Sequence, residues 1–170
     1  EVFSWNAILL SLTDRHDEAL EYLKEASKIA ESSDKPLQVG TYYHAHGVFN
    51  ASKKNWKEAV SSLEEALKIG RNNAVFEILV KAELELARTY MKAYEHENDD
   101  KYLASAAYHL DDLIQIAKEQ GLKSLYAEVL LLRSDVFRFA NKKLESKGDI
   151  DRALSLANYV DDKRLVNQAQ

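Results

Sequence analysis

The sequence predicts an all-α chain, a solenoid of antiparallel helix pairs with about eight helices. One observation is a series of small residues: Ala19, Ala59, Ala106 and Ala153 follow one another at intervals of 40, 47 and 47 residues. A small residue that recurs over such a period is typical of stacked two-helix repeats. The other observation is a scarcity of turn formers, because 5 glycines and 1 proline in 170 residues are too few for the turns of an all-β chain.

Apolar residues at three-to-four residue spacing mark the individual helices. Eight segments are expected, near residues 2–13, 15–31, 36–53, 56–71, 74–97, 100–119, 123–147 and 149–159. No linker or low-complexity tract separates them, so the sequence predicts a single domain over residues 1–170. Its repeats are expected at 1–35, 36–73, 74–121 and 122–160, and the polar tail 161–170 is either a capping helix or a stub of a further repeat.

Several residues at the ends of these segments have the chemistry of helix termini. Pro36 is expected in the first turn of the third helix, where a missing N–H is tolerated. Gly121 is expected to take a left-handed conformation after the sixth helix. The candidate N-terminal caps are Asn55 with Glu58, Asp14 with Asp17, and the run Asn98-Asp99-Asp100.

Small residues also predict how the helices pair. In the second helix of each pair, apolar or small residues recur in one register: Ala19, Leu23, Ala26 and Ile29; Ala59, Leu63, Ala66 and Ile69; Ala106, Leu110, Leu113 and Ile116; Ala153, Ala157 and Val160. The first helices carry the matching small residues Ala7, Gly47, Ala87 and Ser134, which let two helix axes approach closely. The distance from each to its partner alanine is 12, 12, 19 and 19 residues. Seven residues make about two turns, so the first helices of the last two pairs are expected to be long.

Composition excludes several classes of protein. The absence of cysteine removes disulfides and thiolate metal sites and suits the reducing cytoplasm. No apolar run exceeds four residues, so no membrane span is expected. A net charge of −5 without a basic stripe argues against direct nucleic-acid binding. Because the sequence begins at Glu1 and its only methionine is Met91, we expect it to be part of a longer or processed chain.

The second repeat resembles the tetratricopeptide repeat. Tyr43, Gly47, the run Asn55-Trp56-Lys57-Glu58-Ala59, Leu63 and Ala66 follow its order of aromatic, small and apolar positions. Leu86-Ala87 with Tyr90 resembles the first helix of that repeat, and the run from Gly148 to Ala153 resembles the turn into its second helix. The unit is about 40 residues, as in the long-repeat members found in sensor arrays of bacterial signal-transduction ATPases and in spindle-orientation adaptors. The resemblance implies a right-handed superhelix.

The resemblance also implies a binding groove lined by the first helix of each pair. Its stripe would comprise Thr41, His44 and Val48; Lys81, Leu84, Arg88 and Met91; and Glu128, Leu131, Asp135 and Arg138. This mixture of apolar side chains and charges of both signs suits a peptide or a helix laid in a groove. Chaperone-binding members hold a C-terminal carboxylate with a Lys and an Asn where this sequence has His44 and Val48. The chain is therefore not expected to be a receptor for chaperone tails.

Other candidate sites have simpler explanations. His44 and His46 are two residues apart and point to different faces of a helix, so a shared metal is not expected. The run from His96 to Asp100 lacks the second histidine of a zinc-protease motif and is interpreted as a solvated helix end. No glycine-rich loop or nucleophile elbow is present, so neither a cofactor nor catalysis is expected. Trp56 is expected to pack between repeats rather than to bind a partner.

Two function classes remain. One is a protein-interaction module or scaffold that binds a peptide or helical segment of a partner, as part of a larger protein. The alternative is the ligand-sensing array of a signal-transduction or transcriptional regulator, whose curvature changes when a ligand binds. Self-association through terminal helices is a further possibility, with Val2, Phe3 and Ile8 as the exposed apolar residues of the first helix.

Overall fold

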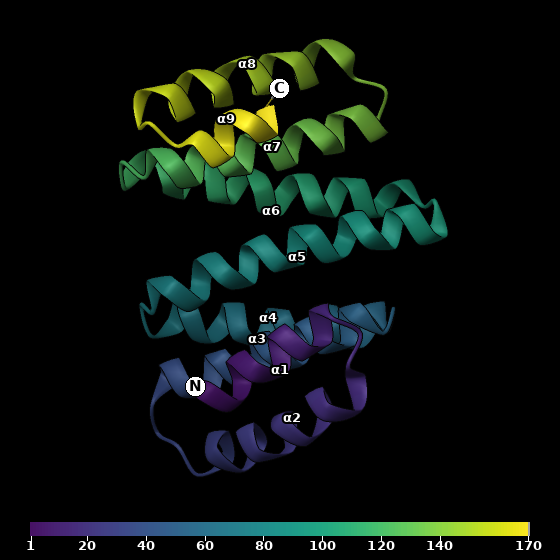
Figure 1. The fold of residues 1–170 in the computed structure, drawn as a ribbon, viewed down its shortest axis with the longest axis vertical. Coiled ribbons are helices and arrows are strands. Elements are labelled where there is room, and N and C mark those ends of the chain that lie inside the picture. The colour runs from purple at the N-terminus through teal and green to yellow at the C-terminus, as the bar shows by residue number, and fades with distance from the viewer. Residues whose placement is uncertain (170) are drawn as a thin grey trace. The chain divides into compact units, whose positions relative to one another are not determined.

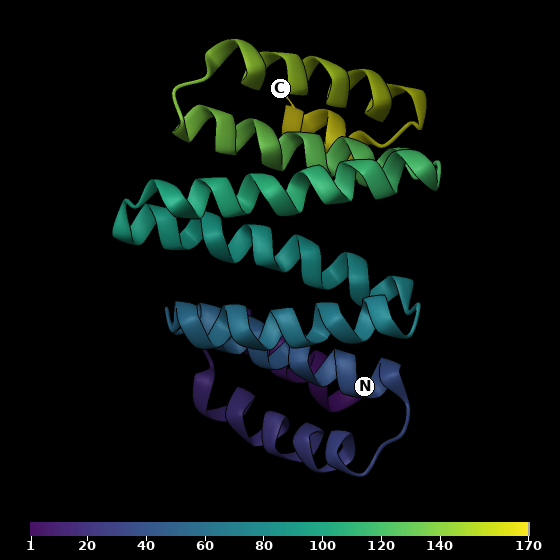
Figure 2. The ribbon, with the colours of Figure 1, turned by 180° about the vertical axis from the view of Figure 1, so that it is seen from behind.

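The computed structural model describes residues 1–169, and this part of the chain is entirely helical (Figure 1). Short turns connect consecutive helices, which run antiparallel to one another (Figures 1 and 2). The all-α class of a tetratricopeptide-like helical solenoid is therefore confirmed. No helix among the described residues is long and apolar enough to cross a membrane. The helices are α1 (Val2–Leu12), α2 (His16–Glu31), α3 (Pro36–Ser52), α4 (Trp56–Asn72), α5 (Phe76–Glu97), α6 (Asp100–Glu119), α7 (Lys123–Phe139), α8 (Lys143–Tyr159) and α9 (Lys163–Ala169).

The chain divides into two compact units, and the division falls within α5 between Thr89 and Tyr90. In unit 1, residues 1–89, α1 packs against α2 and α3, and α3 packs against α4. In unit 2, residues 90–170, α7 packs against α6 and α8, and α9 packs against α8 and α7. The organisation as a single domain remains a prediction.

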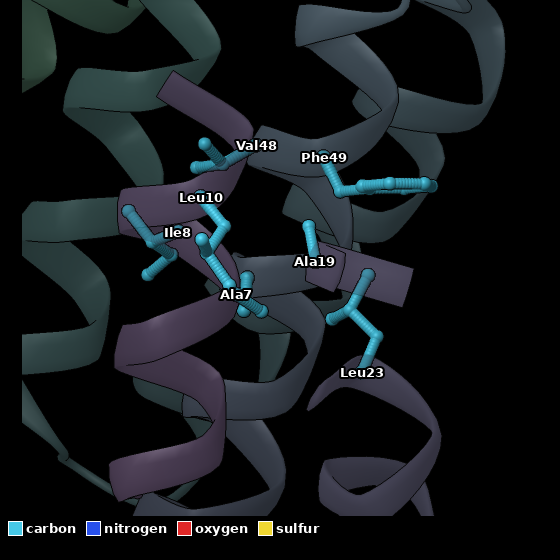
Figure 3. Close-up of a cluster of buried hydrophobic side chains, with 8 residues drawn as sticks. Ala7, Ile8, Leu10, Ala19, Leu23, Val48 and Phe49 are labelled. Atoms are coloured by element: carbon cyan, nitrogen blue, oxygen red, sulfur yellow. The ribbon is translucent and has the colours of Figure 1, made fainter. Parts of the chain in front are cut away.

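The core of unit 1 joins its first three helices (Figure 3). Small side chains lie where the helices meet, and Ala7, Ala19 and Ala45 are completely buried. Larger side chains fill the space around them: Ile8, Leu10, Leu23, Val48 and Phe49. Each of the larger groups removes apolar surface from water and so stabilises the contact between helices.

Gly47 shows how closely the helices of the second pair approach. A Cβ atom at this position would lie 2.5 Å from Leu63 Cγ and 3.2 Å from the carbonyl oxygen of Ala59. No side chain fits in that space without a shift of α3 away from α4. The prediction that the small residues mark the contact between paired helices is therefore confirmed for this pair.

Most turns between helices contain one residue in the left-handed conformation. Gly121 has φ of 67°, as predicted, and residues with a Cβ take similar values in six other turns: Asp14, Lys54, Ala74, Asn98, Asn141 and Asp161. A left-handed residue reverses the chain within about three residues, which is why consecutive helices can lie side by side. Non-glycine residues adopt this conformation at an energetic cost, so packing of the helices must offset it.

The helix starts agree with the sequence in part. Pro36 occupies the first turn of α3, and the side chain of Asp99 accepts a hydrogen bond of 3.0 Å from the N–H of Lys101, both as predicted. The predicted cap at Asn55 is wrong, because its side chain makes no cap hydrogen bond and instead donates to Asn50 Oδ1 at 3.4 Å. The cap predicted at Asp14 is also wrong, because this residue lies in the turn with φ of 58°.

One predicted helix boundary in the last pair is wrong. The seventh segment was expected to reach residue 147, but α7 ends at Phe139 and α8 begins at Lys143. Asn141 has φ of 57° between them, and the N–H of Lys142 donates to the carbonyl of Phe137 at 2.8 Å. Asparagine tolerates this conformation better than most residues, so the chain turns within a run that periodicity alone reads as continuous.

This boundary changes the register of the last pair. The buried residue of α8 that lies 12 positions after Ser134 is Ser146, which restores the spacing of the first two pairs. Ala153 then corresponds to Ala66 rather than to Ala59, and Gly148 lies inside α8 instead of in a turn. The interval from Ala106 to Ser146 is 40 residues, so the extra seven residues occur only once. They belong to the pair of α5 and α6, the longest helices, at 22 and 20 residues.

Candidate partner-binding surfaces

The groove residues predicted on α3 are buried within unit 1. Thr41, His44 and Val48 expose only 4%, 7% and 4% of their surface. Val48 belongs to the same core cluster as Ile8, because α1 packs against α3 on this side (Figure 1). A partner would have to displace neighbouring side chains to touch these residues. Their role in binding remains a prediction, and the accessible surface of unit 1 lies elsewhere.

His44 is buried without a hydrogen bond to its Nδ1 atom from any described residue. Burial lowers the pKa of this imidazole to about 4, and the positive charges of Lys81 and Arg88 lower it further in the same direction. The ring is therefore neutral at physiological pH, because its charged form would lose hydration and face two cations. The arrangement makes His44 a packing residue of the core whose protonation opposes folding.

The α5 stripe, defined as Lys81, Leu84 and Arg88, is partly exposed in unit 1. Glu77 pairs with Lys81, and Glu85 Oε2 lies 3.6 Å from Arg88 Nη1. Lys81 Nζ also lies 4.0 Å from the centroid of the Trp5 ring. Two cations therefore flank one apolar side chain on this helix, and their positions are set by contacts within unit 1.

Unit 2 holds the remaining predicted groove residues. The α7 stripe, defined as Glu128, Leu131, Asp135 and Arg138, is partly exposed, as is Met91 on α5. Arg138 Nη2 lies 2.8 Å from Asp135 Oδ1, and the Arg138 side chain is 68% exposed. Burial raises the pKa of Asp135, while the charge of Arg138 opposes that shift. The stripe thus combines an apolar side chain with charges of both signs, as the sequence predicts.

Helix α9 covers part of the α7 stripe, and the sequence did not reveal this contact. Leu165 on α9 is completely buried, and Arg164 Nη2 lies 3.8 Å from Glu128 Oε2 (Figure 1). Asp162, just before α9, lies 3.7 Å from the same Arg164 atom. The polar tail is therefore a capping helix, one of the two structures expected for it, and it leaves the end of α7 near Arg138 more open than the end near Glu128.

A second accessible surface lies on the outer face of α1. The α1 stripe, defined as Val2, Trp5, Leu9 and Leu12, is 71%, 41%, 63% and 60% exposed. Ile8 was expected on this face, but it is 9% exposed and belongs to the core. The spacing of three, four and three residues in the stripe was available in the sequence, but the direction in which α1 faces its neighbours was not.

A hollow of about 490 Å³ lies between α2 and α3 of unit 1, with Tyr42 and His46 among its lining residues. His46 Nδ1 lies 2.8 Å from Ser62 Oγ, and burial lowers the pKa of the ring. The α2 side of the hollow carries the ion pairs Glu21–Lys24 and Glu25–Lys28. Within the described residues no cluster of three or more metal-ligating side chains occurs, here or elsewhere.

Antiparallel helix pairs joined by tight turns, with small residues at each contact, define a helical-repeat protein. Residues 1–72, which hold α1 to α4, match the family model of the tetratricopeptide repeat. The chain thus belongs to the tetratricopeptide repeat family through its first two helix pairs. No curated protein sequence shows significant similarity to the chain.

Proposed function

We propose that the chain is an interaction module that binds a peptide or helical segment of a partner protein. Tetratricopeptide repeats generally mediate protein–protein interaction and scaffolding. The observation that supports the finer proposal is the pair of partly exposed stripes on the first helices α5 and α7. On this proposal the chain supplies binding and no catalytic step, and it acts in a reducing compartment such as the cytoplasm, in keeping with its lack of cysteine.

The chemistry of the stripes favours an amphipathic partner segment. On α5, Leu84 offers apolar surface one turn from Lys81 and one turn from Arg88. On α7, Leu131 is followed one turn later by Asp135 and then by Arg138. A helix or extended peptide gains affinity by burying an apolar side chain on each leucine, and the flanking charges determine its orientation.

Site-specific photo-crosslinking tests this proposal. A photoreactive phenylalanine analogue placed at Leu84 or at Leu131 should capture a protein from lysate, and mass spectrometry should identify one continuous segment of it. The same analogue at Ser155, an exposed residue of α8 away from both stripes, is the matched control. Capture of the same segment by the control would refute binding at the stripes.

Charge reversal then tests the role of the stripe cations. Arg88→Glu with Arg138→Glu should weaken binding of the captured segment at least about tenfold and leave the helical content unchanged. Arg88→Lys with Arg138→Lys keeps the charges and should retain most of the affinity. Equal binding by the wild type and the reversed variant would contradict the proposal. Binding of a small molecule in place of a protein segment would favour a ligand-sensing array.

A further inference from the structure

The α1 stripe is the most concentrated exposed apolar surface among the described residues. Val2, Trp5, Leu9 and Leu12 are all large apolar side chains, and each exposes 41% or more of its surface. Their helical angles fall within a sector of about 80°, because successive residues are 100° apart. A continuous apolar face of this kind on a folded domain indicates a contact with another protein surface.

The spacing of the stripe is symmetric about its centre. Its intervals are three, four and three residues, so the pattern reads the same in both directions along α1. When such a helix lies antiparallel to a second copy, residues whose numbers sum to 14 face each other. Val2 then lies opposite Leu12 of the other copy, and Trp5 lies opposite Leu9. Each contact joins apolar groups, and each occurs twice, as a twofold interface requires.

The charges of α1 also suit a second copy. Residues 2–12 contain no charged side chain, so two copies of this face do not repel each other. The one cation in contact with the stripe is that of Lys81 on the Trp5 ring, and Glu77 balances its charge. By contrast, the exposed face of α2 carries three ion pairs and is well solvated alone.

We propose that the chain forms a dimer in which α1 pairs antiparallel with α1 of a second copy through the α1 stripe. One helix of 11 residues provides less than the roughly 800 Å² per partner of a stable interface. The dimer is therefore weak, with a dissociation constant of about 10–100 µM. This surface is distinct from the α5 and α7 stripes, so the dimer does not depend on partner binding there.

Sedimentation velocity of the 170-residue chain from about 1 to about 500 µM tests the dimer. The expected result is a concentration-dependent shift from monomer to dimer. Leu9→Glu should raise the dissociation constant at least about tenfold, because it places a charge at the centre of the apolar contact. Leu144→Glu, at a residue of α8 that is 85% exposed, is the matched control and should have no effect. A monomer at every concentration, or a dimer unaffected by Leu9→Glu, would overturn the proposal.

A pair of charged variants tests the antiparallel register. Val2→Glu and Leu12→Lys should each weaken self-association, because a charge then faces an apolar side chain twice. An equimolar mixture should form a heterodimer at concentrations where each variant alone is monomeric, since the introduced carboxylate of one variant then faces the introduced ammonium of the other. A mixture that stays monomeric would refute this register. Circular dichroism of each variant confirms that its helical content is unchanged.

Discussion

Two glycine-to-alanine substitutions, in different helices, are predicted to have opposite effects on stability. Gly70 lies in α4, and a Cβ atom at this position would be 2.7 Å from the backbone N of Leu79 and 2.9 Å from its Cα. Gly148 lies inside α8, and a Cβ atom there would have no neighbour within 4 Å. The same chemical change therefore meets backbone at one position and open space at the other.

The magnitudes follow from two opposing effects. Alanine is favoured over glycine in a helix by about 1 kcal/mol, and Gly148→Ala should gain most of this amount. At Gly70 the contact is with the backbone of α5, which cannot rotate away as a side chain can, so overpacking costs about 1–3 kcal/mol. Gly70 is also close to the end of α4, where the helix gain is small. Gly70→Ala should therefore lower the free energy of unfolding by roughly 1–2 kcal/mol.

Urea unfolding monitored by two signals measures both effects. The chain has two tryptophans, Trp5 and Trp56, and both lie in unit 1 with Gly70, so their fluorescence reports on that unit. Circular dichroism reports on all helices. Gly70→Ala should lower the midpoint of the fluorescence transition by roughly 0.5–1 M urea, and Gly148→Ala should raise the midpoint of the dichroism transition. A Gly70→Ala protein at least as stable as the wild type would show that α4 and α5 do not approach this closely.

Three further substitutions test other features of the structure. Ala74→Gly should stabilise the chain by about 0.5–1 kcal/mol in the same urea assay, because Ala74 has φ of 53°; a loss of stability would show that this turn carries no strain. Asp149→Asn should destabilise by roughly 2–4 kcal/mol, since the largely buried Asp149 accepts two hydrogen bonds of 2.7 Å from Arg133, whereas Asp111→Asn, at a 61% exposed partner of the same arginine, should cost less than about 1 kcal/mol. Equal costs for the two would contradict a buried ion pair. His44, with a folded pKa of about 4 against an ordinary value of 6.5, binds its proton more weakly in the folded state, so stability should fall by up to about 3 kcal/mol as pH drops from 6.5 to 4. His44→Leu should reduce that decline, and an unchanged pH dependence would place the imidazole in solvent.

Local periodicity was sufficient for the first six helices but not for the last two. The run from residue 123 to 147 has no strong break, and the position of the turn depends on Asn141 adopting φ of 57°. That choice is made when α8 packs back on α7, because it buries Ser146 against the preceding helix. A seven-residue shift along a helix preserves its buried face, so the pattern of small residues fitted both registers equally well.

The candidate surfaces show the same division. The types of residue in the stripes of α5 and α7 were predictable, since a helical repeat places residues at fixed spacing on one face. The burial of His44 was not predictable, because it depends on which neighbour covers α3. The covering of Glu128 by α9 was likewise invisible in a polar tail whose only fully buried side chain is Leu165.

The sequence by itself determined that the chain is all helical, that its helices form pairs, and that small residues mark their contacts. These properties depend on spacing along one helix and on the size of single side chains, which are local quantities. Only the tertiary structure decided where the last pair turns, which predicted groove residues are accessible, and that the α1 stripe faces outward. Those properties depend on contacts between residues distant in sequence, and the same apolar spacing is compatible with a buried or an exposed face until a neighbouring helix covers it.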